Sequence, residues 1–421
     1  MQLGVIADDF TGATDIASFL VNNGMSTIQL TSIPKQPINI DCNIQAVVIS
    51  LKSRSCAVNI AVKESVEALR WLKEQGCSKF YFKYCSTFDS TDKGNIGPVI
   101  DALLDELEES FTVISPSLPI NGRTVYQGYL FVMDKLLSDS GMKNHPINPM
   151  TESSLIKLIE RQASGKCGLI PYCEMEKGEI AIRKQLTRLK QENYRYVVLD
   201  TLTDEHLVSQ GKAVKDLKLV TGGSGLAIGV AKNFAKSDVN SKQAQILGKP
   251  QGHNKTVLLS GSCSLMTNKQ VEFYKTVAPT YTLNIEKCIN EPEDYCQVVI
   301  DWTNNHQQQK YAPLVSATTD IEQLNVIQQT WGVEKSSQAV EYFFKQLVIA
   351  LEKQGYDKYI VAGGETSGVV VQALNVHGFY IGPTIAPGVP WVRSINKSIS
   401  LALKSGNFGD ESFFVTAQGD F

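Results

Sequence analysis

The sequence predicts an α/β protein of two domains, each with a mostly parallel sheet flanked by helices, and with a ligand cleft between them. Three observations support this. Short apolar runs alternate with longer segments of helical periodicity, a pattern typical of βαβ units. The chain has 421 residues, more than one hydrophobic core usually supports. The alternation also lapses once, in a polar stretch that separates two halves.

The first domain is expected at residues 1–235. Its strands are predicted from short, continuous apolar runs, and its helices from apolar residues that recur every three or four positions. In the first helix, Ala13, Ile16 and Leu20 share one face, and Gly24 ends the pattern. The predicted elements are a strand at 3–7, a helix at 11–23, a strand at 46–51, a helix at 57–75, a strand at 79–84, a helix at 96–109, strands at 111–115 and 194–200, and a helix at 225–234.

The polar stretch at 236–255 has no sustained apolar stripe, and we interpret it as the connection between the domains. The second domain is expected at 256–421. Its predicted elements are a strand at 256–260, a strand at 312–317, a helix at 338–354, a strand at 358–362 and a helix at 366–375.

The composition excludes several classes of function. The formal net charge of −3 argues against a nucleic-acid-binding protein, which would need a basic face. The N-terminus lacks the features of a signal peptide, and no apolar run approaches the roughly 20 residues that span a bilayer. The nine cysteines show no CxxC pair, which favours free thiols in the reducing cytoplasm over a disulfide framework or a zinc site.

Polar residues follow three predicted strands of the first domain. Asp8 and Asp9 follow the first strand and could hold a substrate hydroxyl or accept its proton. The simpler alternative is that Asp9 or Thr11 caps the helix and Asp8 is a turn residue. Arg54 follows the second strand and suits a carboxylate or phosphate, although an isolated KSR is also typical of a solvated loop. The third loop contains Lys83, hydroxyl groups and glycines, a mixture that suits a polyhydroxylated acid or an ordinary polar loop.

The second domain has three candidate loops for a nucleotide. Ser260 opens a loop of small residues, SGSCS, and the segment GGETSG begins at Gly363 between a predicted strand and helix. Adjacent glycines before a helix N-terminus suit a phosphate, and a tight structural turn is the alternative. The Gly/Pro-rich stretch 382–390 and the loop that contains Gly406 could wall a nucleotide, or could be turns between antiparallel strands.

Together, these motifs resemble the four-carbon acid sugar kinases. IADDFTGATD, KYCSTFDSTDKGNIGP, SGSCS and GGETSG occur in order along essentially the whole chain, and the continuation GATDIASFLVNNG is most similar to 3-oxo-tetronate kinases. The resemblance implies that the first domain binds the sugar acid and the second binds ATP. It places on the substrate side Asp9, Arg54, Lys83, Tyr84, Cys85 and Ser86, and on the nucleotide side Ser260, Gly363, Gly364, Glu365, Thr366 and Gly406.

We therefore expect a kinase that uses ATP and Mg²⁺ to phosphorylate the terminal hydroxyl of 3-oxo-tetronate. In this hypothesis Arg54 and Lys83 hold the substrate carboxylate, and Asp8 or Asp9 acts as the base. A threonate or erythronate kinase of the same family is one alternative, and a non-enzymatic two-lobed sugar-acid-binding protein is another. An oxidoreductase would need a GxGxxG motif after a strand, which the sequence lacks. We expect no nucleic-acid or membrane partner, and leave a homo-oligomer open.

Overall fold

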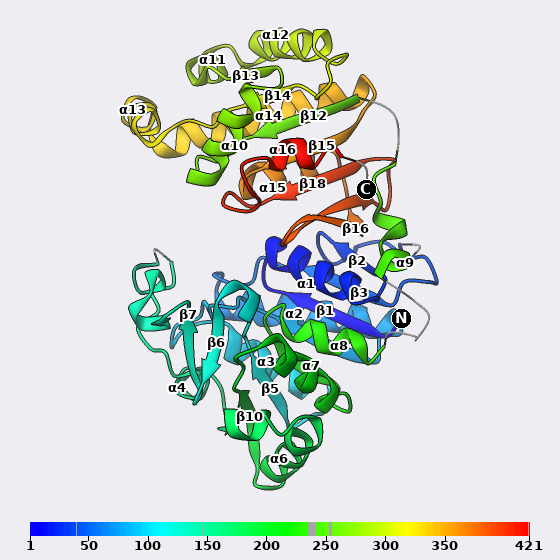
Figure 1. Ribbon diagram of the computed structural model, residues 1–421, viewed down its shortest axis with the longest axis vertical. Helices are drawn as coiled ribbons and strands as arrows, with labels where there is room; N and C mark the ends of the chain where they lie inside the picture. Colours follow the sequence, from blue (N-terminus) through cyan, green and yellow to red (C-terminus); the bar gives the residue numbers. More distant parts are fainter. Residues whose placement is uncertain (39, 146, 235–240, 252–254, 420) are drawn as a thin grey trace. The chain divides into compact units, whose positions relative to one another are not determined.

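The computed structural model of the chain describes residues 1–38, 40–145, 147–234, 241–251, 255–419 and 421 (Figure 1). These residues form two compact units, Met1–Ala244 and Gln245–Phe421. The division falls inside the segment 236–255, part of which lies outside the described residues, so its role as a linker stays a prediction. Within the described residues, no helix is long and apolar enough to cross a membrane.

The N-terminal unit is built on an all-parallel sheet, as the βαβ rhythm predicts. Its strands are buried along nearly their whole length, because helices cover both faces of a parallel sheet. In spatial order the strands are β2 (Thr27–Leu30), β3 (Ala46–Ser50), β1 (Leu3–Ala7), β4 (Lys79–Lys83), β11 (Leu219–Gly222), β5 (Thr112–Ser115), β10 (Tyr194–Leu199) and β9 (Lys166–Ile170).

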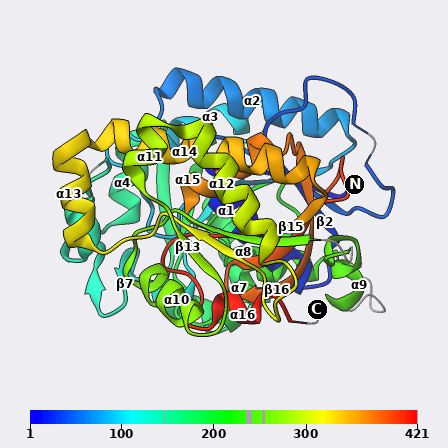
Figure 2. The same cartoon turned by 90° about the horizontal axis from the view of Figure 1, so that it is seen from above.

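Two groups of helices cover this sheet. On one face α2 (Val58–Glu74) contacts α3 (Ile96–Glu106), and on the other α8 (Leu226–Lys232) contacts both α1 (Phe10–Asn22) and α7 (Asp204–Ala213) (Figures 1 and 2). The predicted helices at 11–23, 57–75, 96–109 and 225–234 are therefore confirmed to within a few residues at their ends. The remaining helices are α4 (Leu155–Gln162), α5 (Tyr172–Met175), α6 (Glu179–Gln191), and the 3₁₀ turns Pro119–Asn121, Leu137–Asp139 and Gly141–Asn144.

A small antiparallel sheet, absent from the sequence-based prediction, is inserted after β5. It consists of β6 (Arg123–Tyr126), β7 (Tyr129–Val132) and β8 (Lys135–Leu136). The two residues between β6 and β7, Gln127 and Gly128, both have positive φ, of 53° and 75°. That is the backbone of a tight hairpin turn. The buried carboxylate of Asp200 supports the turn, because it accepts hydrogen bonds from both backbone N–H groups at 2.8 and 2.9 Å.

The C-terminal unit has a mixed sheet. Five strands are parallel, in the order β13 (Thr280–Thr282), β14 (Leu314–Ser316), β12 (Lys255–Ser260), β15 (Tyr356–Ala362) and β18 (Ser400–Lys404), and two antiparallel strands follow, β17 (Val389–Ser394) and β16 (Gly378–Ala386). The helices are α10 (Leu265–Lys275), α11 (Ile285–Asn290), α12 (Pro292–Asn305), α13 (Ile321–Trp331), α14 (Val333–Lys353), α15 (Gly364–Ala373) and α16 (Phe413–Thr416). The short helix α9 (Ser241–Gln245) and the 3₁₀ turn Ile246–Gly248 come before the sheet.

The expectation of loops throughout 382–390 was wrong in part. Gly382 and Pro383 lie inside β16, and only Pro387 and Gly388 form the turn to β17. The register of the β16–β17 pair shifts between Ile381 and Thr384, and such an irregularity tolerates a proline that cannot donate to the ladder.

Candidate active site

The polar loops of the N-terminal unit meet at one edge of its sheet. Ala7, the last residue of β1, is in register with Ser50 on β3 and with Lys83 on β4, and Lys83 is in register with Gly222 on β11. Because these strands are parallel and end at the same level, the segments that follow them lie together. The three polar loops that follow these predicted strands thus lie at one edge of the sheet.

Asp8 and Arg54 form a bidentate ion pair. Arg54 Nε donates to Asp8 Oδ2 at 2.8 Å, and Nη2 donates to Oδ1 at 2.9 Å. The backbone carbonyl of Asp8 also accepts from the N–H groups of Ser53 and Arg54. Asp8 is almost fully buried, so this carboxylate fixes the guanidinium and the loop that carries it.

Asp9 is the more accessible carboxylate, with 30% of its side chain exposed. Its Oδ1 caps α1 by accepting from the Gly12 N–H at 2.8 Å, and it also lies 2.9 Å from Arg54 Nη2. A Cβ added at Gly12 would clash with Asp9 Oδ1 and lie 2.5 Å from Lys83 Nζ, which places that ammonium near Asp9. The N-cap interpretation of Asp9 is thus confirmed, and it leaves Asp9 Oδ2 with no hydrogen bond to the described residues.

Charges and burial compete in this cluster. Burial raises the pKa of Asp8, and the nearby Arg54 opposes that shift. Burial also raises the pKa of Asp15, which lies one turn into α1, while Lys83 and Ser224 oppose it. Burial alone would lower the pKa of Arg54, but the two aspartates raise it above its ordinary value, so this side chain stays charged.

Each cation keeps donor capacity. Arg54 Nη1 makes no hydrogen bond within the described part of the chain, although Nε and Nη2 do. Lys83 is buried to 4% exposure, and its ammonium has no hydrogen bond or ion pair to a described residue. The edge therefore offers two cationic donors beside one accessible carboxylate.

The remaining predicted substrate residues are placed differently. The Tyr84 side chain is fully buried, with its hydroxyl 3.1 Å from Thr221 Oγ1, and its ring packs edge-on against Phe88. Only the backbone of Tyr84 therefore belongs to the polar edge, because its side chain points into the core. Cys85 Sγ lies 2.9 Å from Thr87 Oγ1, and both Cys85 and Ser86 are half-buried in the loop that follows Lys83.

Two polar contacts at this edge were missed by sequence reasoning. The Ser224 hydroxyl donates to Asp15, whose only signal was a single charge in the otherwise uncharged helix α1. The Asn95 side chain donates to the carbonyls of Ser53 at 2.7 Å and Cys56 at 2.9 Å, and so holds the Arg54 loop. For Asn95 the signal was an amide in a loop of glycines and hydroxyls.

A small cavity lies under the same loop. It measures about 10 Å³, room for about one water molecule, and is lined in part by Asp8, Ser53 and Asp89. Ser53 Oγ and Asp89 Oδ1 are buried and make no hydrogen bond to any residue that the structure describes. Both atoms suit a bound water, which would tie the Arg54 loop to the loop after β4.

The C-terminal unit presents a second edge of the same kind. Ser260 on β12 is in register with Ala362 on β15, which is in register with Lys404 on β18. Gly363 follows Ala362 with φ of 122°, a conformation that a residue with a Cβ rarely adopts, and turns the chain into α15. The backbone N–H of Ser262 would lie 3.2 Å from a Cβ at Gly363, so the two turns are adjacent.

The predicted nucleotide residues surround this edge. Gly364 and Glu365 are exposed at the start of α15, and Thr366 is buried against Gly261. Ser260 is fully buried, and its Oγ shares a hydrogen bond with Thr318 Oγ1 at 2.6 Å. Gly406 lies beside the loop that follows Ser260, and its carbonyl accepts a hydrogen bond from Thr267 Oγ1 at 2.7 Å.

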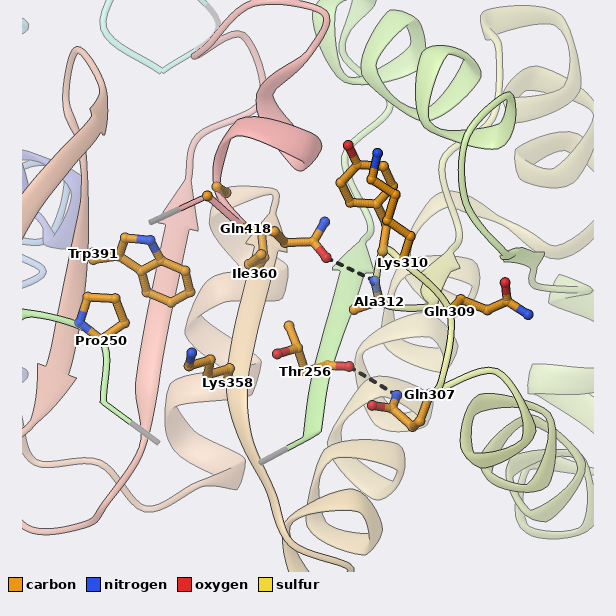
Figure 3. Close-up of a pocket in the computed structure, with 13 residues that line it drawn as sticks. Pro250, Thr256, Gln307, Gln309, Lys310, Ala312, Lys358, Ile360, Trp391 and Gln418 are labelled. Atoms are coloured by element: carbon orange, nitrogen blue, oxygen red, sulfur yellow. Dashed lines mark hydrogen bonds between the residues drawn. The ribbon is translucent and has the colours of Figure 1, made fainter. Parts of the chain in front are cut away.

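A larger hollow of the C-terminal unit lies away from this edge. It has a volume of about 260 Å³, and its lining includes Thr256 and Lys358, near the starts of β12 and β15 (Figure 3). Gln307 donates to the Thr256 carbonyl at 3.0 Å on its wall. Because the nucleotide residues follow the other ends of these strands, this hollow is not part of the predicted site. Among the described residues, no group of three or more His, Cys, Asp or Glu side chains could hold a metal ion.

Comparison with known proteins assigns the chain to a family. Its residues 3–230 match the family model for a sugar-binding N-terminal domain, and residues 257–414 match that for a nucleotide-binding C-terminal domain. A curated relative from Pectobacterium atrosepticum, named 3-oxo-tetronate kinase, is 56% identical over 100% of this chain and 99% of its own. The chain belongs to the four-carbon acid sugar kinase family.

Other members of this family are similar over their whole length. A Salmonella typhimurium relative, also named 3-oxo-tetronate kinase, is 55% identical over 100% of this chain and 99% of its own. A solved structure from Salmonella typhimurium LT2, provisionally described as a tRNA synthase, has a TM-score of 0.94 at 55% identity and covers 99% of this chain and 98% of its own. A solved Haemophilus influenzae protein has a TM-score of 0.90 at 52% identity, with 99% of each chain covered.

Proposed function

We propose that this chain is an ATP-dependent 3-oxo-tetronate kinase. It transfers the γ-phosphate of ATP to the terminal 4-hydroxyl of the sugar acid and releases ADP and 3-oxo-tetronate 4-phosphate, a step in sugar-acid catabolism. The observation that carries this proposal is the geometry around Asp9, where an accessible carboxylate lies beside two cations that both keep unused donors. The full-length similarity to relatives of that name supports the choice of substrate.

The substrate carboxylate binds to the unused donors. Arg54 Nη1 and Lys83 Nζ are the groups available, because Asp8 already occupies Arg54 Nε and Nη2. Asp8 thus acts by holding the guanidinium in place. The role of Asp8 as the base, one of the two roles considered from the sequence, is not part of this proposal.

Asp9 is the general base. Its Oδ1 is engaged by the Gly12 N–H and by Arg54, and its Oδ2 is available to accept the proton of the 4-hydroxyl as the oxygen attacks phosphorus. The P–O bond to ADP breaks as the new P–O bond forms, and the proton moves to Asp9. Phosphoryl transfer depends on such alignment more than on covalent chemistry by the protein.

The second edge holds the nucleotide. The turn at Gly363–Thr366 offers the phosphates backbone N–H groups at the start of α15, and the loop at Gly406 lies beside it, next to Ser262. A Mg²⁺ ion bound with ATP would neutralise part of the phosphate charge, and such an ion needs only one or two protein carboxylates in addition to the phosphates. Glu365 is the exposed carboxylate at this turn that could contact it.

Transfer requires the acid-binding edge and the nucleotide edge to meet around the reactants, in the cleft that the sequence predicts. Their approach would exclude water and limit hydrolysis of ATP. We place the enzyme in the cytoplasm, where ATP is available and where its nine free cysteines remain reduced. A homo-oligomer stays a prediction, which light scattering can test.

The test is a substrate panel. The purified chain is incubated with ATP, Mg²⁺ and, in turn, 3-oxo-tetronate, threonate and erythronate, and ADP release is followed together with the ³¹P NMR spectrum of the product. We expect ADP release with 3-oxo-tetronate and a phosphomonoester at its 4-position. Greater kcat/KM with threonate or erythronate would refute the substrate assignment, and acid binding without ADP release would refute the kinase.

A further inference from the structure

Lys404 is an unusually buried cation at the nucleotide edge. It is the last residue of β18, and only 1% of it is exposed. A buried lysine normally has a carboxylate partner, because transfer of an unpaired ammonium out of water is costly. Lys404 has no such partner among the described residues.

Backbone and hydroxyl oxygens surround its ammonium instead. Lys404 Nζ donates to Thr267 Oγ1 at 3.0 Å, to the Ser405 carbonyl at 3.2 Å and to the Gly406 carbonyl at 2.8 Å. Thr267 in turn donates to the Gly406 carbonyl at 2.7 Å. These bonds hold the turn at 405–406 against α10 with every ammonium proton used.

This turn lies against the other nucleotide segments. A Cβ added at Gly406 would lie 2.7 Å from Ser262 Oγ and 2.9 Å from Ser264 Oγ, and Ser262 is also next to Gly363. The position of Gly406 relative to both turns therefore depends on what holds its backbone. The turn at Gly363 has no lysine of its own, and its only charged side chain is Glu365.

We propose that Lys404 is the positioning cation of the nucleotide site: its ammonium holds the turn at 405–406 in place, and its charge, which no carboxylate neutralises, attracts the nucleotide phosphates. This inference rests on the proposed function, because it assigns the nucleotide to this edge. It goes further by naming the basic side chain that the glycine turns lack.

The surroundings of Lys404 leave its charge uncompensated. α10 presents Thr267, α16 presents the Phe413 ring with its centroid 5.8 Å from Nζ, and Ala362 on β15 is in register with Lys404. Gln270 of α10, which binds the carbonyls of the following loop, is neutral. The charged groups nearby on these segments are exposed and engaged elsewhere, since Lys269 pairs with Glu411 at 3.4 Å and Asp410 accepts from Ser412.

Burial lowers the pKa of Lys404 to about 7. A bound polyphosphate would favour the charged form and raise this pKa again, so nucleotide binding should take up a proton. At pH 8 a group with a pKa of about 7 is roughly one-tenth protonated, which leaves most sites able to accept one.

The test is calorimetric titration of the full chain with the Mg²⁺ complex of the non-hydrolysable analogue AMP-PNP. Measurements at pH 8 in two buffers of different ionisation enthalpy give the number of protons taken up. We expect the wild type to take up roughly half to one proton per site. Lys404→Met should abolish the uptake and weaken binding by roughly ten- to a hundredfold, while the KM for the sugar acid stays unchanged.

Gln270→Met is the matched control. Gln270 donates to the carbonyls of Phe408 and Asp410 in the same loop, but it carries no charge. It should lower stability and leave the proton uptake intact. If Lys404→Met does not fold, the number of protons that the wild type takes up on binding AMP-PNP still tests the inference.

Three results would overturn the inference. Wild-type protein that binds the analogue without proton uptake contradicts it, and so does Lys404→Met that binds as tightly as the wild type. In both cases the proposed kinase function stands. Wild-type protein that binds no adenine nucleotide refutes the proposed function and this inference with it.

Discussion

Asparagine at Asp8 and asparagine at Asp9 should damage the protein in different ways. Both changes remove a carboxylate charge next to Arg54 with almost no change in size. Asp8 is the partner that holds the guanidinium in its two-point contact, whereas Asp9 offers the accessible oxygen. The prediction is that Asp8→Asn mainly reduces stability and acid binding, and that Asp9→Asn mainly reduces turnover.

The magnitudes follow from burial. In the Asp8–Arg54 pair the side chains are 6% and 23% exposed, and loss of one member of such a pair costs about 3 kcal/mol. For a unit of this size that lowers Tm by roughly 6–12 °C. Asp9 is 30% exposed, and asparagine caps a helix as well as aspartate does, so its loss costs less than about 1 kcal/mol. Removal of a general base lowers kcat by roughly 10²–10⁴.

The assay combines unfolding and kinetics on the same samples. Thermal unfolding gives Tm for each variant, and ADP release at saturating ATP gives kcat and the KM for the sugar acid. Asp8→Asn should show the lower Tm and the higher KM. Asp9→Asn should keep a Tm within a few degrees of the wild type and show the lower kcat. Near-normal kcat in Asp9→Asn, with Asp8→Asn folded but inactive, would refute the assignment and make Asp8 the base.

Three further predictions test the loops and the buried lysine. Asn95→Ala leaves the carbonyls of Ser53 and Cys56 without their donor and should lower the free energy of unfolding by about 1–3 kcal/mol. It should also raise the KM for the acid but not the KM for ATP. An unchanged KM for the acid in steady-state kinetics would contradict this prediction. Gly363→Ala places a Cβ on a residue with φ of 122° and adds about 1–3 kcal/mol of backbone strain. Calorimetry should show weaker binding of AMP-PNP and unchanged binding of the acid. An unchanged affinity for AMP-PNP would contradict this prediction. Burial lowers the Lys404 pKa from 10.5 to about 7, so between these values the unfolded chain binds more protons and folding gains stability as pH rises. Urea unfolding of the wild type relative to Lys404→Met should therefore show stability rising by at most about 1.4 kcal/mol per pH unit between pH 7 and 9, and a flat difference contradicts it.

The central strands, and the meeting of the three polar loops at one edge of the N-terminal sheet, could be predicted from the sequence. The strands Leu3–Ala7 and Ala46–Ser50 are buried at every residue. Strands buried on both faces have continuous apolar sequences, which can be recognised without a structure. Residues that follow parallel strands must meet at one edge of the sheet. The positions of Asp9, Arg54 and Lys83 follow from that topology alone.

The resemblance assigned neighbouring residues of a motif to the same site, but it could not predict the direction in which each side chain points. Lys83 and Tyr84 are adjacent at the end of an extended strand, where successive side chains point to opposite sides. Lys83 therefore faces the cluster around Asp9, and Tyr84 turns into the core toward Thr221. The same limit applies to Ser260, whose hydroxyl is directed to Thr318.

The other features that were not predicted from the sequence depend on contacts between segments far apart in the chain. The hairpin turn at Gln127–Gly128 lacks the Asn-Gly sequence that usually identifies it, and Asp200, more than seventy positions away, supplies its support. Asp15 is likewise stabilised by a hydroxyl on Ser224. A local pattern carries no information about such partners, because folding alone brings them together.

In the proposed function, the balance of charge at the first edge would explain how a site for a sugar acid can contain more carboxylates than cations. Asp8, Asp9 and Asp15 lie around Arg54 and Lys83, and burial raises the pKa of Asp8 and Asp15, which reduces their repulsion of an anion. An inorganic anion would satisfy the two donors and still face Asp9. A sugar acid presents a carboxylate to the donors and a hydroxyl to Asp9, so it satisfies both. The acidic side chains would therefore favour a hydroxylated acid over simple anions, and the oxygen of Asp9 that would discriminate between them is the one proposed to accept the proton.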